Sequence, residues 1–170
     1  MYRVKRHPHN KGFTLIEVMV SLVVMSIGML GLASIQAISI QNNQTAYMRT
    51  LAMQSAYNIA DLIRTGSDSD GTITSVFDAV TSTVPSAPTN CIVNDSSTSC
   101  SAADMAASDI YQWKKNLETL LPSGRGAITR SGSIYEIKIM WDEDRTGETG
   151  EGCDPTDADD LKCYQLFIQI

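Results

Sequence analysis

The stretch KGFTLIEVMVSLVVMSIGMLGL, residues 11–32, contains an almost unbroken apolar run from Phe13 to Leu32. A helix of about 20 apolar residues is long enough to cross the hydrocarbon core of a bilayer. Glu17 is the one charged residue within this run. Because a carboxylate inside a membrane span costs free energy, its presence there indicates a function rather than an accident of composition.

Positive charge lies on one side of the apolar run. Four basic residues precede it, and the first basic residue after it is Arg49. The positive-inside rule therefore predicts a single-pass helix with a cytoplasmic N-terminus and the rest of the chain on the far side. A cleaved secretory signal, cut near Ala33 or Ala37, is the alternative. The run is longer than the usual 7–15 apolar residues of such a signal, which favours a retained helix.

The composition narrows the classes of function. The chain has 170 residues, 13 basic and 19 acidic, a net charge of −6, and 43% hydrophobic residues, which predicts one folded domain with an appended helix. The acidic balance argues against a broad nucleic-acid footprint. Both histidines, His7 and His9, precede Gly12, so a chain starting at Phe13 has none and carries nine basic against 19 acidic residues. Without histidine, a serine or cysteine triad and a His-ligated zinc site are excluded, and we expect no enzyme activity and no cofactor.

The segment Lys11–Val18 resembles the processing signature of type IV pilins and pseudopilins: a short basic leader, Gly, then Phe, and Glu at the fifth mature position. The resemblance implies that a prepilin peptidase cleaves between Gly12 and Phe13 and methylates the new amine of Phe13. It also implies that Glu17 neutralises the Phe13 amine of a neighbouring subunit in a filament. An amine and a carboxylate are each less costly in hydrocarbon as a pair than alone, which agrees with that role. Snorkelling of Glu17 toward the inner interface is the alternative.

The apolar helix is expected to continue beyond the membrane. No Pro or Gly interrupts residues 35–64, and apolar residues recur there at intervals of three and four. We therefore predict a leader at 1–12, a transmembrane and assembly half of the helix at 13–35, an extramembrane half at 36–65, and a globular domain at 66–170. Gly28 and Gly31 are explained equally well as a soft point in the helix or as sites of close helix packing.

The globular domain is predicted to be mixed α and β. Residues 66–101, rich in Ser, Thr, Asp and Gly, read as a connecting region with short elements at most, such as 73–80. A capping box at Ser101–Asp104 opens a helix that carries Trp113 as a core residue and ends before Pro122 and Gly124. Strands follow at 126–130, 134–141 and 163–170, the first two forming a hairpin. The expected fold is pilin-like α+β: a long N-terminal helix, transmembrane in its first half, packed against a small antiparallel sheet with an extra helix.

A second resemblance is to the PilV family of minor pilins, the type IV pilus modification proteins. It rests on Ser26–Ala33 and on Trp113 followed by the sequence LLPSG at residues 120–124. It implies a part in pilus assembly or initiation that supports adhesion, twitching motility or DNA uptake. The implied partners are other minor pilins, the major pilin, prepilin peptidase and the inner-membrane assembly machinery. The implied location is the inner membrane, with the C-terminal domain periplasmic, and after assembly the pilus at the cell surface. The I-type minor pseudopilin of type II secretion shares the first motif and is the alternative.

Four cysteines are expected on the outer side of the membrane, where disulfides persist. Of the three pairings that four cysteines allow, the local ones are Cys91–Cys100 and Cys153–Cys163. A tetrathiolate zinc site is the alternative, but zinc-binding cysteine pairs usually lie two to four residues apart. Disulfides are therefore predicted.

Two charged groups invite a functional interpretation. Asp142, Asp144 and Glu148 form a weak calcium candidate, but Cys153 stands where a calcium loop of the EF-hand type needs Glu, so a solvated acidic loop and no metal are favoured. The same solvated interpretation covers the later acids Asp154, Asp157, Asp159 and Asp160. A basic group, consisting of Lys114, Lys115, Arg125 and Arg130, is interpreted either as a spot for DNA or an acidic partner or, more commonly, as solvated charge.

Overall fold

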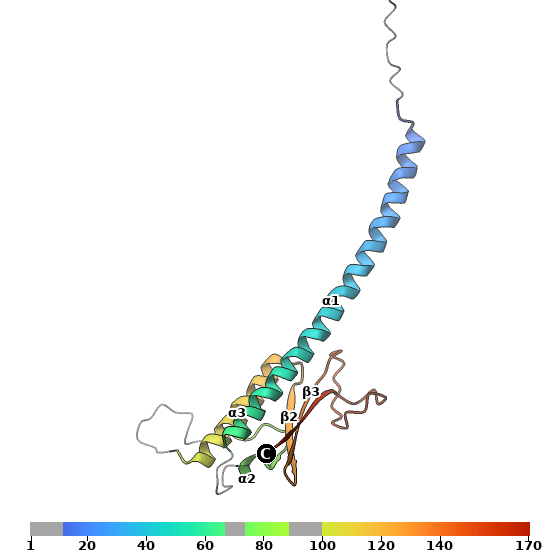
Figure 1. The fold of residues 1–170 in the computed structure, drawn as a ribbon. Helices are drawn as coiled ribbons and strands as arrows, with labels where there is room; N and C mark the ends of the chain where they lie inside the picture. The colour runs from blue at the N-terminus through green and yellow to red at the C-terminus, as the bar shows by residue number, and fades with distance from the viewer. Residues whose placement is uncertain (1–11, 67–73, 89–99) are drawn as a thin grey trace, which may run out of the picture. The chain divides into compact units, whose positions relative to one another are not determined.

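The computed structural model describes residues 12–66, 74–88 and 100–170 (Figure 1). The elements are α1 (Leu15–Thr65), α2 (Thr74–Phe77), β1 (Ala79–Val80), α3 (Ala102–Leu120), β2 (Arg125–Ser131), β3 (Ile134–Trp141) and β4 (Lys162–Gln169). The chain divides into two compact units between Asn43 and Gln44, and α1 contributes to both.

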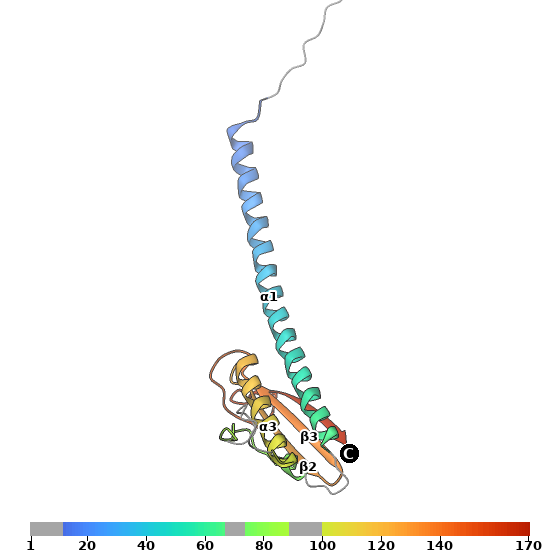
Figure 2. The same cartoon turned by 90° about the vertical axis from the view of Figure 1, so that its left-hand side faces the viewer.

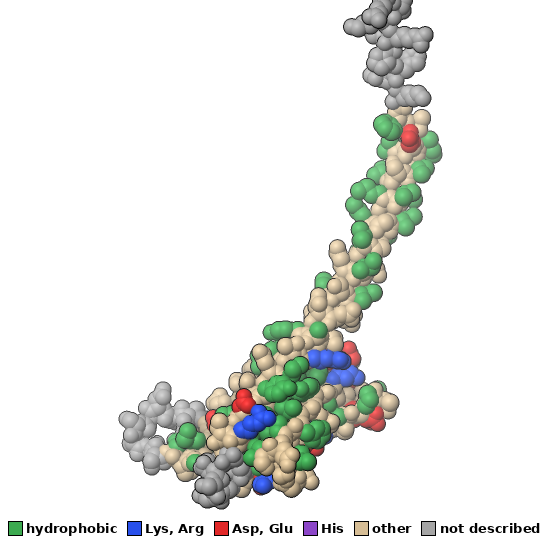
Figure 3. All heavy atoms as spheres, viewed as in Figure 1, with side chains coloured by type: hydrophobic (Ala, Val, Ile, Leu, Met, Phe, Trp, Pro, Cys, Tyr) green, Lys and Arg blue, Asp and Glu red, His purple; other side chains and the backbone are tan. Residues whose placement is uncertain are grey.

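In the first unit, every described side chain is exposed. Most of these side chains between Leu15 and Ile40 are large and apolar, and Figure 3 shows them covering this part of α1. A helix that is apolar on all sides is typical of a membrane span or of the interior of an assembly. This part of α1 is thus long and apolar enough to cross a membrane.

The second unit is built on a four-stranded antiparallel sheet with the strand order β1-β2-β3-β4. The β2–β3 hairpin closes through Gly132 and Ser133, with Ser131 paired to Ile134. Gly132 has φ of +63°, a left-handed conformation that glycine adopts without steric cost. In β3, Ile137 pairs with Ile128 of β2 and with Leu166 of β4, so β3 is the central strand of the long trio.

One face of the sheet and two helices form the core (Figure 2). Alternate residues of the strands point to this face, as the period of two requires. From α1, small and β-branched residues fit into it, which lets the helix lie close to the sheet. The buried apolar residues of this core are Ala52, Ala56, Ile59, Ala60 and Ile63 of α1, Ala106, Ile110, Trp113 and Leu117 of α3, and Val80, Ile128, Tyr135, Ile137, Ile139, Trp141 and Ile168 of the sheet.

The closest packing between α3 and the sheet occurs at Gly126 of β2. A Cβ atom placed there would lie 2.3 Å from the Cη2 of Trp113 and 2.6 Å from a methyl carbon of Leu117. Such contacts are far inside van der Waals range, so only glycine fits. Trp113 is buried as predicted, with 5% of its surface exposed.

The predicted α+β fold is confirmed. The helix starting at Ala102 has the expected capping box, in which Ser101 Oγ accepts from the Asp104 amide at 3.1 Å and the Asp104 carboxylate accepts from the Ser101 amide at 3.2 Å. The hairpin and the last strand lie within a residue or two of their predicted ranges. The connecting region contains short elements where they were expected, at residues 73–80: α2, and β1, which pairs with Ile128 and Thr129 and extends the sheet.

Candidate functional site

The predicted processing segment lies at the start of α1. The helix begins at Leu15, and Thr14 acts as its cap: its carbonyl accepts from the Glu17 amide at 3.1 Å and from the Val18 amide at 3.3 Å. Phe13 precedes the helix and is 83% exposed. A Cβ atom on Gly12 would meet nothing within 4 Å. No contact with the described residues therefore requires glycine at position 12.

Glu17 is the third residue of α1 and is exposed. Its carboxylate is near the positive end of the helix dipole, which favours a negative charge. Thr14 and Glu17 also have the spacing of a capping box, and Thr14 Oγ1 accepts from the Glu17 amide at 3.4 Å. This helix-start signal is present in the sequence as Thr14 followed three residues later by Glu17.

The other polar side chains of the apolar segment are satisfied within the helix. Ser21 Oγ donates to the Glu17 carbonyl at 2.8 Å, and Ser26 Oγ donates to the Leu22 carbonyl at 2.7 Å. Hydroxyls bonded in this way are tolerated in hydrocarbon. Within Leu15–Leu32, all of which is described, Glu17 is therefore the one polar side chain with no hydrogen-bond partner.

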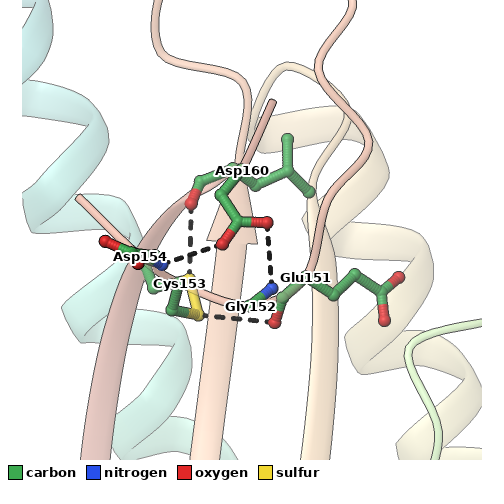
Figure 4. The surroundings of a disulfide bond; sticks show 7 residues. Glu151, Gly152, Cys153, Asp154 and Asp160 are labelled. Atoms are coloured by element: carbon green, nitrogen blue, oxygen red, sulfur yellow. Dashed lines mark hydrogen bonds between the residues drawn. A yellow bond between two sulfur atoms is a disulfide. The ribbon is translucent and has the colours of Figure 1, made fainter. Parts of the chain in front are cut away.

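The C-terminal acidic region is held by the disulfide Cys153–Cys163, whose Cα atoms are 5.5 Å apart. Figure 4 shows the carboxylate of Asp160 beside it, pointing at the backbone of the same segment. The carboxylate accepts from the Gly152 amide at 3.1 Å and from the Asp154 amide at 2.8 Å, and Asp160 is only 8% exposed. The prediction of a solvated acid is wrong for Asp160, which organises its own loop. For the other predicted disulfide, Cys91 lies outside the described residues.

The calcium candidate is not assembled into a metal site. Asp142 is 3% exposed, and its two carboxylate oxygens accept from the amides of Thr146 at 3.1 Å and Gly147 at 2.8 Å. Asp144 is exposed, and Glu148 accepts from the Thr146 hydroxyl at 2.8 Å. Among the described residues, no group of three or more His, Cys, Asp or Glu side chains is placed to share a metal ion. Asp142 therefore acts as the cap of a turn.

For one member of the basic group, Lys114, the interpretation as solvated charge is wrong, because the side chain is buried. It is 2% exposed, and its ammonium donates to the carbonyl of Thr81 and, at 2.6 Å, to that of Thr83. Burial lowers the pKa of Lys114 below its usual 10.5. The lysine thus ties the segment after β1 to α3.

The other three basic residues are each engaged with an acid. Lys115 pairs with Glu118 at 2.9 Å, Arg125 with Glu151 at 2.8 Å, and Arg130 with Asp78 at 3.1 Å. Basic charge neutralised in this way does not attract phosphates strongly. The less favoured alternative, a free basic spot for DNA or an acidic partner, is therefore not formed by these residues.

Comparison with known proteins adds one finding. Residues 7–33 match the family model described as the prokaryotic N-terminal methylation motif. No curated protein sequence and no solved structure matches the chain. The matched motif covers Lys11, Gly12, Phe13, Glu17 and the apolar run, and with the long apolar α1 it indicates membrane anchoring. Motif and α+β fold together support a type IV pilin-like or pseudopilin-like protein.

Proposed function

We propose that this chain is a minor type IV pilin of the PilV kind, a structural protein without enzyme activity or cofactor. A prepilin peptidase cleaves it between Gly12 and Phe13 and methylates the Phe13 amine. The mature chain then enters a pilus, or the complex that initiates one, at low copy number. The observation that carries the proposal is the match of residues 7–33 to the methylation motif, directly at the start of α1, whose apolar first part has every side chain exposed up to Asn43.

Accessibility supports the processing step. The Gly12–Phe13 bond precedes the first residue of α1, and Phe13 is 83% exposed, so the bond is free of helix hydrogen bonds. A peptide bond outside regular structure is open to a peptidase. A Cβ atom at position 12 would meet no described atom within 4 Å, which fits a glycine that is selected by the peptidase and not by packing.

The assembly step rests on Glu17. In hydrocarbon an unpaired carboxylate is costly, and the serines of the same segment are already satisfied. A methylated Phe13 amine from a neighbouring subunit supplies the missing positive charge. The apolar side chains around Glu17 then pack against the corresponding helices of the other subunits.

The proposed partners follow from this assembly. They are other minor pilins and the major pilin, the prepilin peptidase, and the inner-membrane pilus assembly machinery. Before assembly the chain is a single-pass inner-membrane protein with its N-terminus in the cytoplasm and residues 66–170 in the periplasm. After assembly it is in the pilus at the cell surface.

The test compares Glu17→Gln and Ser21→Ala with the unmodified chain in a piliated host. We expect all three to be processed, and the amount of Glu17→Gln recovered in sheared pili to fall by about tenfold or more, because one lost charge pair in hydrocarbon costs at least ~1.4 kcal/mol. Ser21→Ala removes only an intrahelical bond and should assemble normally. Normal recovery of Glu17→Gln in pili would contradict the assembly role.

The alternative is an I-type minor pseudopilin of type II secretion, which the Ser26–Ala33 motif equally fits. A deletion separates the two machines. Loss of surface pili and twitching with normal enzyme secretion supports the pilin, and the opposite phenotype supports the pseudopilin.

A further inference from the structure

A cavity of about 530 Å³ lies in the second unit, between α1 and the segment around the Cys153–Cys163 disulfide. Most of its wall is apolar, from Met53, Trp141, Pro155, Leu161 and Tyr164. Two cations, Arg49 and Lys162, also line it. Apolar walls with a few polar groups are the usual composition of a binding site.

The wall contains a buried donor without an acceptor. Trp141 is 2% exposed, and its indole Nε1 is fully buried with no hydrogen-bond partner in the part of the chain that the structure describes. An indole N–H can only donate, and buried donors are nearly always paired in native proteins. The second tryptophan, Trp113, obeys this rule, since its Nε1 donates to the Ser55 carbonyl at 3.1 Å. We therefore expect the Trp141 N–H to donate to an acceptor that is not part of the described chain.

The charges of the wall favour an anionic acceptor. The side-chain ammonium of Lys162 has no ion pair or hydrogen bond to any described residue. Arg49 has 64% of its side chain exposed, and its Nε is 3.7 Å from Glu143 Oε1, too far for a hydrogen bond. Arg49 and Glu143 therefore form an ion pair that balances part of the Arg49 charge, while the guanidinium donates no hydrogen bond to any described residue.

The one acidic residue that lines the cavity, Asp154, accepts hydrogen bonds from its own turn. The Oδ1 of Asp154 accepts from the amide of Thr156 at 2.8 Å and from its hydroxyl at 2.7 Å. These bonds lower the pKa of Asp154 and hold its carboxylate on its own turn. Asp154 forms no ion pair with Lys162 in the described structure, although its charge offsets part of the positive charge of the wall.

Apolar surface continues out of the cavity along α1. Met53 is 42% exposed, and Tyr57, one turn later, is 48% exposed. The Tyr57 hydroxyl interacts with Tyr164 of the cavity wall, and burial together with Tyr57 raises the pKa of Tyr164. An apolar strip that extends beyond the pocket suits a protein segment better than a small free acid.

We propose that this cavity binds an apolar segment of a partner protein that carries a Glu or Asp side chain. The carboxylate pairs with Lys162 and Arg49, and it accepts the Trp141 N–H once the side chains that bury this nitrogen move aside. The apolar neighbours of the carboxylate lie along Met53 and Tyr57. The inference concerns the second unit alone, so it stands apart from the processing and assembly of α1.

The test uses the full-length protein in amphipol, labelled with 5-fluorotryptophan, so that Trp141 and Trp113 each give one fluorine resonance. The probe is the peptide acetyl-Ala-Leu-Glu-Leu-Ala-amide, and its matched control has Gln in place of Glu. With the Glu peptide we expect a saturable shift of the Trp141 resonance and no shift of the Trp113 resonance. We expect the Gln peptide to bind about tenfold more weakly than the Glu peptide. Lys162→Gln should weaken the Glu peptide by about threefold or more, and Lys138→Gln should not.

Three results would overturn the proposal. They are no Trp141 shift at millimolar Glu peptide, an equal response to the two peptides, and binding unaffected by Lys162→Gln. A second arm titrates 3-phenylpropionate, a free acid of similar chemistry. Tighter binding of this acid than of the Glu peptide would make the cavity a small-molecule site and refute a protein partner.

Discussion

The indole Nε1 of Trp113 donates a 3.1 Å hydrogen bond to the backbone carbonyl of Ser55, 58 positions earlier in the chain. Ser55 belongs to α1 and Trp113 to α3, and both are buried. Carbonyls inside a helix already accept one bond, and this one uses its second lone pair to join the two helices. The bond fixes the position of α3 along α1.

Trp113→Phe removes this bond and part of a large buried ring. We expect the free energy of unfolding to fall by about 2–4 kcal/mol, since a lost buried bond and a small cavity both contribute. Chemical denaturation followed by circular dichroism measures it. The control is Trp141→Phe, whose indole N–H has no protein acceptor in the described chain and should cost clearly less. Equal losses in the two variants would contradict the role of the Ser55 bond.

Lys114→Met tests the buried ammonium on α3. The thioether keeps the length of the side chain but cannot donate to Thr81 and Thr83, whose carbonyls lose a charged donor. We expect destabilisation of about 1–3 kcal/mol and faster hydrogen exchange in residues 79–88. Lys115→Met, at the exposed neighbouring position, should change stability by less than about 0.5 kcal/mol. Stability unchanged in Lys114→Met would show that the ammonium does not hold this segment.

The capping box of α3 predicts a pH dependence. Hydrogen bonds from the Ser101 hydroxyl and amide lower the pKa of Asp104 below 3.8. The carboxylate therefore stabilises the fold above pH 3.8, and that contribution is lost as the pH falls through the lower pKa of the folded state. Asp104→Asn should lack this loss, so the stability difference from the unmodified chain should shrink toward pH 2. A difference that stays constant from pH 7 to pH 2 would contradict the cap.

Replacing both Cys153 and Cys163 by Ser tests the C-terminal crosslink. The two cysteines are ten positions apart, and closing so short a loop contributes about 2–3 kcal/mol in the chain-entropy model. The free energy of unfolding should fall by that amount. The amides of Gly152 and Asp154, which donate to Asp160, should exchange faster. Unchanged exchange at these amides would mean that Asp160 alone holds the loop.

The sequence predicted the parts of the fold that depend on local patterns. The end of α1, the capping box at Ser101, the β2–β3 hairpin and β4 each have a signal within a few residues, and each forms as predicted. The antiparallel sheet against a long helix followed from these elements and their order. The disulfide between Cys153 and Cys163 also forms between close neighbours in the sequence.

What the sequence did not predict depends on contacts between distant segments. Lys114 looks like a solvated helix residue, and only the passage of residues 81–83 over α3 buries it. Asp142 and Asp160 look like members of a solvated acidic run, yet each closes a loop with its carboxylate. The strand β1 has only two residues, and its conformation depends on backbone pairing with β2, which lies about 50 positions later in the chain. Tertiary context overrides local charge patterns at all of these positions.

The mature N-terminus tests the central claim most directly. Intact and peptide mass measurements would compare the chain from cells with and without prepilin peptidase. The proposed function predicts a chain that begins at N-methylated Phe13 when the peptidase is present and retains residues 1–12 when it is absent. A chain that begins near Ser34 or Ile38 in both strains would identify an ordinary signal peptide and contradict the pilin account, including the role of Glu17.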